Sequence, residues 1–170
     1  MNNPIAVIGL GNSLMQDEGA GVHLLHELRR RYGDHPRIGF YDGGTKGLSL
    51  LPYMESCRRL LLIDAVEADA PGGSVHEFNR QQLLSGRIPV KLSVHDIALS
   101  DLLALLALRR GHSMADLRLI GVVPESLQLS TELSPTVRAA LPEMRRRAEK
   151  LLNQWLEDLS SPTEEETACA

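Results

Sequence analysis

The chain has 170 residues, of which 43% are hydrophobic and 24% are charged, and its formal net charge is -4 at pH 7. This length and balance predict one folded domain with a single well-buried core. The acidic balance gives no electrostatic footprint for nucleic acid. No apolar run reaches the roughly 20 residues that a membrane-spanning helix needs. We therefore expect neither nucleic acid nor a membrane as a partner.

The two cysteines, Cys57 and Cys169, lie far apart and form no CxxC or Cys/His spacing. This excludes a disulfide framework and a thiolate zinc site, and it favours a reducing compartment. The opening residues, MNNPIAVIG, lack the basic segment of a signal peptide and lead directly into an apolar run. The sequence therefore predicts a cytoplasmic protein.

Short apolar runs alternate with longer amphipathic segments along the chain. The predicted strands are residues 5–8, 38–41, 60–63, 74–78 and 117–122, and the predicted helices are residues 20–32, 48–54, 97–109 and 135–159. This alternation predicts a three-layer α/β domain, in which helices cover both faces of a twisted, mostly parallel five-stranded sheet. A short APGG turn before residue 74 favours an antiparallel edge strand there. We expect the domain to span residues 1–159 and the acidic tail, 160–170, to be disordered.

Residues 5–22, IAVIGLGNSLMQDEGAGV, begin like a dinucleotide-binding turn and then depart from it. Gly9 and Gly11 follow the first strand, but Leu14 occupies the position of the third glycine of a nucleotide fold. The turn then presents two adjacent carboxylates, Asp17 and Glu18, which would repel a pyrophosphate. The same carboxylates suit a cation.

Polar residues also follow the other predicted strands, at the edge where ligands bind in open α/β sheets. Asp64 ends the third strand and His95 stands at the start of a helix, where SVHD resembles a capping box. With Glu18 they offer two oxygens and one imidazole, a set that suits a divalent transition metal such as nickel or zinc. Asp42 ends the second strand before two glycines.

Each of these residues also has a purely structural explanation from spacing alone. Asp64 and Asp42 are good turn formers, His95 fits a first helical turn, and acids such as Asp17 and Glu18 are favoured at helix starts. The spacing alone leaves both explanations open.

Three other features are discounted. His23 and His26 lie on one helix, but their order with Glu27 fits neither HExxH nor HxxEH. Ser126 has no GxSxG context, and Cys57 is most simply a structural cysteine.

Taken together, these segments resemble the hydrogenase maturation endopeptidases, which process the large subunit of nickel–iron hydrogenases. The resemblance covers about residues 5–140 and rests on six segments in the family's order: VIGLGNSLMQDEGAGV, YDGGTKGLSLL, LLLIDAV, APGG, SVHDIALSDLL and LIGVVPESLQLSTELSPTV. Single segments such as the GxGN turn are weak signals, whereas six in register are specific.

The resemblance implies an endopeptidase that removes a C-terminal extension from the nickel-loaded large-subunit precursor. It places the family's three metal-contacting positions on Glu18, Asp64 and His95, where nickel carried by the substrate would dock. It places the family's acid on Asp42, and we expect Asp42 or Asp17 to position or deprotonate the attacking water. The enzyme is expected to act as a monomer, and the resemblance leaves open another divalent metal in its free form.

Two alternatives from other functional classes remain at this point. The same three ligands would suit a nickel or zinc chaperone for hydrogenase assembly that cleaves nothing. A nucleotide-dependent enzyme is the weakest alternative, because the third glycine is missing and the acids oppose a phosphate.

Overall fold

The computed structural model describes residues 3–85, 99–110 and 116–160. The strands are β1 (Ile5–Leu10), β2 (Ile38–Gly44), β3 (Arg59–Ala65), β4 (Val75–Asn79) and β5 (Asp116–Val122). The helices are α1 (Ala20–Tyr32), α2 (Leu51–Ser56), α3 (Arg80–Leu84), α4 (Leu99–Arg110) and α5 (Pro135–Asp158), with short 3-10 turns η1 (Gln16–Gly19) and η2 (Gly47–Leu50).

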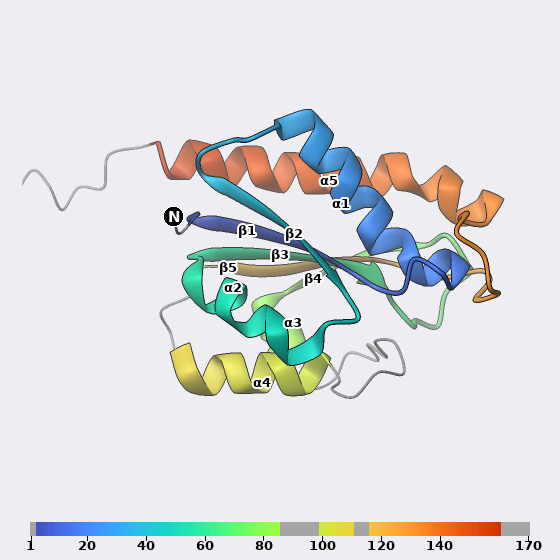
Figure 1. Cartoon of the computed structure of the whole chain (residues 1–170), viewed down its shortest axis with the longest axis horizontal. Helices are drawn as coiled ribbons and strands as arrows, with labels where there is room; N and C mark the ends of the chain where they lie inside the picture. Colours follow the sequence, from blue (N-terminus) through green and yellow to red (C-terminus); the bar gives the residue numbers. More distant parts are fainter. Residues whose placement is uncertain (1–2, 86–98, 111–115, 161–170) are drawn as a thin grey trace, which may run out of the picture.

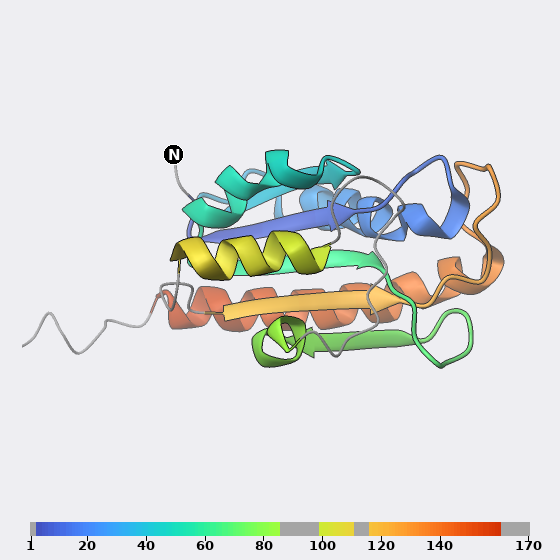
Figure 2. The ribbon, with the colours of Figure 1, turned by 90° about the horizontal axis from the view of Figure 1, so that it is seen from below.

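The five strands form one sheet in the order β2-β1-β3-β5-β4. All neighbours pair in parallel except β4, which runs antiparallel to β5 at the edge. Helices α1 and α5 lie on one face of the sheet, and α2, α3 and α4 lie on the other (Figures 1 and 2). The predicted three-layer α/β architecture, including its antiparallel edge strand, is confirmed.

The central strands are apolar throughout because both of their faces are covered. In β1, Ile5 and Val7 pack into the core beneath α1 and α5, whereas Ala6 and Ile8 pack into the core beneath α2 and α4. This alternation follows from the two-residue period of a strand. Burying an Ile or Leu side chain contributes roughly 1.5–3 kcal/mol relative to leaving it exposed. The two cores, one on each face, therefore stabilise the sheet whose carboxyl edge carries the candidate site.

Close approach of α1 to the sheet depends on a glycine that the nucleotide-fold comparison did not indicate. A Cβ on Gly21 would overlap the carbonyl oxygens of Leu10 and Ile63, so only glycine allows this helix to lie so near β1 and β3. Leu14, which occupies the position of the third glycine of a nucleotide fold, is 56% exposed. The helix-packing role therefore falls to Gly21.

The predicted helix signals are confirmed at two ends. The Ser134 hydroxyl accepts a hydrogen bond from Val137 N at 3.2 Å and caps α5, whose first residue is Pro135. Gly33 ends α1 with a φ of 59°. The expected capping box around His95 and the first residues of the helix predicted at 97–109 lie outside the described residues.

Two features of the fold differ from the expectation. The five-residue helix α3 was not predicted; it is held by a capping box in which Asn79 accepts from Gln82 N and the Gln82 side chain accepts from Asn79 N. The predicted helix at 48–54 is instead a 3-10 turn followed by α2. In the described part of the chain, no helix combines the length and the apolar character needed to cross a membrane.

Candidate functional site

The turn after β1 brings two carboxylates together at the carboxyl edge of the sheet. Gly11 has a φ of +109°, a conformation that favours glycine, and its N–H donates to the carbonyl of Gly44 at 3.0 Å. A Cβ on Gly11 would overlap the carbonyl oxygen of Glu18 and would lie 3.5 Å from Asp64 Oδ1. The backbone of Glu18 and the side chain of Asp64 therefore both lie close to Gly11, and the Glu18 charge is near enough to act on the Asp64 carboxyl.

Asp64 is a buried acid with one unused oxygen. Its residue is 2% exposed, Oδ1 accepts the Ala65 N–H at 2.8 Å, and Oδ2 is buried without a hydrogen-bond partner among the described residues. Burial raises the pKa of this carboxyl well above its ordinary value of 3.8, and the neighbouring Glu18 raises the pKa further. A buried acceptor without a donor beside a second carboxylate fits a cation.

Glu18 supplies the second carboxylate of the site. It lies in η1, is half-buried, and its charge opposes ionisation of Asp64. A divalent cation between the two would reverse this repulsion. His95, the predicted third ligand, lies outside the described residues. Within 3–85, 99–110 and 116–160, no three acids, histidines or cysteines gather in a way that could hold a metal ion.

Asp42 lies at the carboxyl end of β2, where the register between β1 and β2 shifts. Its side chain is 48% exposed, and Oδ2 lies 3.9 Å from His26 Nε2, while Lys46 Nζ donates to its carbonyl at 2.8 Å. The polar contacts of Asp42 within the described chain thus run to His26 and Lys46. The turn that contains it is joined to the Gly11 turn by the bond to Gly44.

Asp17 occupies an environment unlike that of the other acids. It is 0% exposed, and its carboxylate accepts hydrogen bonds from the backbone N–H groups of Glu125, Ser126 and Ser134. Nothing in the local sequence signals these partners, because they lie more than a hundred residues away along the chain. Ser126, discounted as a nucleophile, contributes through its backbone.

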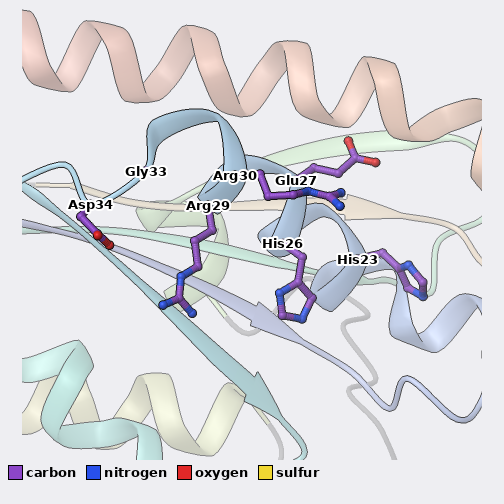
Figure 3. Close-up of a pocket in the computed structure, with 7 residues that line it drawn as sticks. All are labelled: His23, His26, Glu27, Arg29, Arg30, Gly33 and Asp34. Atoms are coloured by element: carbon purple, nitrogen blue, oxygen red, sulfur yellow. The ribbon is translucent and has the colours of Figure 1, made fainter.

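A surface hollow of about 710 Å³ lies along α1, and its lining includes His26, the residue that pairs with Asp42. Figure 3 shows His23, His26 and Arg29 projecting from one side of α1, while Glu27 projects from the other side. The residues that line the hollow include both acidic and basic side chains, but neither Glu18 nor Asp64 is among them. We therefore place the candidate site at the carboxylate pair rather than at this hollow.

Cys57, discounted as a reactive cysteine, is buried in the core, where its Sγ contacts Met54 O at 3.4 Å.

The fold and the site define an α/β protein with an acidic site at the carboxyl ends of parallel strands. The family model for hydrogenase maturation proteases matches residues 22–151. The chain therefore belongs to the hydrogenase maturation protease family, as the six sequence segments implied, and it is a protease.

Curated relatives support this assignment. The chain is 35% identical over 139 residues to the hydrogenase 2 maturation protease of Escherichia coli, covering 81% of this chain and 83% of that protein. It is 31% identical over 152 residues to the hydrogenase expression/formation protein HoxM of Cupriavidus necator, covering 89% of this chain and 75% of the relative.

Solved structures share the fold. The hydrogenase maturating endopeptidase HybD from Escherichia coli superposes with a TM-score of 0.78 at 31% identity, covering 88% of this chain and 92% of that one. The [NiFe] hydrogenase maturation protease HybD from Thermococcus kodakarensis gives a TM-score of 0.70 at 28% identity, covering 86% and 97% of the two chains.

Proposed function

We propose that this protease removes a C-terminal extension from the nickel-loaded large-subunit precursor of a nickel–iron hydrogenase, and that it recognises the substrate-bound nickel. The observation that carries the proposal is the buried Oδ2 of Asp64 near Glu18, which has no hydrogen-bond partner among the described residues. A buried carboxylate oxygen to which no described group donates gains from a cation delivered by the substrate. Glu18 and Asp64, with His95, then serve as the docking ligands.

The proposed division of labour separates docking from bond cleavage. Nickel held by the precursor docks on the carboxylates and brings the adjacent peptide bond into the cleft, which supplies orientation. Asp42, exposed at the end of β2, takes the proton from the attacking water and returns it to the leaving amine. The enzyme acts as a monomer in the cytoplasm and carries no nickel of its own between turnovers.

The test compares two forms of one substrate. The chain is mixed with a nickel-loaded large-subunit precursor and, in parallel, with the nickel-free precursor, and the intact mass of the precursor is measured. Loss of a short C-terminal peptide from the loaded form alone supports the proposal. Equal cleavage of both forms would remove nickel recognition from it. Nickel transfer without any loss of mass would instead support a metal chaperone.

Replacing Asp42 with Asn is expected to separate catalysis from docking. A general base contributes about 10²–10⁴-fold to the rate, so cleavage should fall by at least about 100-fold while the complex with the loaded precursor still forms. His26→Ala is the matched control, because the exposed His26–Asp42 pair at 3.9 Å contributes little, and cleavage should stay within about threefold. Single-turnover cleavage and co-elution measure the two effects, and unchanged cleavage by the Asp42 variant contradicts its role.

A further inference from the structure

The carboxylate of Asp17 is surrounded by backbone donors from a single distant segment. Oδ2 accepts from Glu125 N at 3.0 Å and from Ser126 N at 2.9 Å, and Oδ1 accepts from Ser134 N at 2.7 Å. Hydrogen bonds to an ionised acceptor are roughly twice as strong as neutral ones. We call residues 124–134, which connect β5 to α5, the strap.

Backbone hydrogen bonds join the strap to the turn that precedes Glu18. Asp17 N donates to Ser126 O at 3.2 Å, Gln16 N donates to Ser130 O at 2.8 Å, and Ser130 N donates to Leu14 O at 2.9 Å. Gln16 adopts a φ of 46°, a conformation that costs energy for a residue with a side chain. The backbone hydrogen bonds to the strap therefore offset the cost of this conformation and stabilise the turn.

We propose that Asp17 is a positioning residue that acts through Glu18. By fastening the turn to the strap, its carboxylate fixes the backbone of the next residue and so the direction from which Glu18 meets Asp64 and the substrate's metal. The inference rests on the docking role proposed for Glu18. It replaces the alternative that Asp17 is the general base, because a 0% exposed carboxylate bound to three amides has no water to deprotonate.

We call the three hydrogen bonds from Glu125 N, Ser126 N and Ser134 N to the Asp17 carboxylate the clamp. The clamp requires an acid rather than an amide. Both oxygens of Asp17 accept from N–H groups, one bond on Oδ1 and two on Oδ2. In an Asn side chain one of these positions becomes an NH2 group, which would point a donor at one or two backbone donors. Either orientation of the amide loses part of the clamp and leaves a buried donor unpaired.

The test is a double-mutant cycle on processing of the nickel-loaded precursor. Asp17→Asn is expected to lower kcat/KM by about 10–100-fold, with the same division between kcat and KM as Glu18→Gln. The double variant should be no worse than Glu18→Gln alone, within about twofold, because both substitutions disable one unit. Effects that multiply in the double variant would overturn the inference.

Asn79→Ala is the matched control for stability. It removes the side chain that caps α3, and Asn79 pairs with Arg118 near the start of β5, at the edge of the sheet opposite the site. It should lower Tm while processing stays at the wild-type rate. If Asn79→Ala loses as much kcat/KM as Asp17→Asn, the effect of Asp17 is only structural and the inference is wrong.

A measurement without substrate separates this inference from the proposed function. The amide resonances of Glu125, Ser126 and Ser134 should shift strongly in Asp17→Asn and stay in place in Glu18→Gln, as observed by ¹⁵N–¹H NMR. Unshifted resonances in Asp17→Asn would contradict the clamp. Full activity of Glu18→Gln would contradict the docking function and, with it, this inference, whereas full activity of Asp17→Asn beside an inactive Glu18→Gln contradicts the inference alone.

Discussion

Replacing Asp64 with Asn is expected to stabilise the protein and to stop processing of the precursor. The wild-type carboxylate is buried, one of its oxygens has no hydrogen-bond partner in the part of the chain that the structure describes, and the charge of Glu18 acts on it, so its ionisation is costly in the free enzyme. A neutral amide of the same shape avoids the charge and keeps an oxygen for the Ala65 N–H. We expect a gain of about 1 kcal/mol, which raises Tm by roughly 2–4 °C in a chain of this size.

The same substitution removes a docking ligand, so kcat/KM for the loaded precursor should fall by about 100-fold or more. Gain of stability together with loss of function is the signature of a group that is kept for its chemistry and not for the fold. Asp116→Asn provides the opposite control. The Asp116 carboxylate is paired with Leu117 N, Arg118 and the Trp155 indole, so this variant should lose stability and keep its processing rate.

The pH dependence of the Asp64 variant carries a definite sign. Because the folded-state pKa of Asp64 is raised above the ordinary value of 3.8, the folded state holds this proton more tightly than the unfolded chain does. The protonated Asp64 carboxyl therefore contributes fully to the free energy of unfolding at low pH. This contribution is lost as pH rises from about 3.8, the ordinary pKa, through the raised pKa of the folded state. The Tm difference between Asp64→Asn and wild type should therefore widen with pH. A difference that narrows as pH rises would contradict the raised pKa.

Most of the fold could be predicted because its signals are local. The apolar runs at β1, β3 and β5 and the Ser134-Pro135 start of α5 each depend on neighbours in sequence. Helix α3 escaped prediction because one turn is too short for a helical period to show, although its N-x-x-Q capping box was visible in the sequence. The turn between β3 and β4 indicates an antiparallel edge strand but not its partner. The structure shows that β4 pairs with β5, a strand that follows later in the chain.

The candidate site also combines features that the sequence predicts with features that only the folded structure shows. That Glu18 and Asp64 lie at one edge of the sheet follows from parallel strands ending together, which sequence alone indicates. Two other features depend on contacts across the fold: an Asp64 oxygen finds no partner among residues 3–85, 99–110 and 116–160, and backbone N–H groups of residues 125–134 bind Asp17. The two acids are adjacent in sequence but differ in their surroundings: Asp17 is buried and bound to backbone N–H groups, whereas Glu18 is half-buried and acts on Asp64.

Replacing Gly11 with Ala is expected to disable the site from the backbone. Gly11 has a φ of +109°, and an added Cβ would overlap the carbonyl oxygen of Glu18. Neither neighbour can yield easily, because the strap holds the turn and the sheet holds Asp64. The unfavourable φ costs about 1–2 kcal/mol and overpacking about 1–3 kcal/mol, so together they destabilise the fold by about 2–5 kcal/mol. Displacement of Glu18 should also lower kcat/KM by about 100-fold.

Gly33→Ala isolates the local contribution to this effect. Gly33 also has a positive φ, +59°, but a Cβ there would meet nothing within 4 Å. Its φ of 59° and ψ of -144° fall in a sparsely populated region, so its substitution should cost only this conformational strain, about 1–3 kcal/mol, with processing unchanged. Urea unfolding and precursor processing distinguish the two variants. If Gly11→Ala loses no more activity than Gly33→Ala, then the close packing of Gly11 against the Glu18 backbone does not set the geometry of the site.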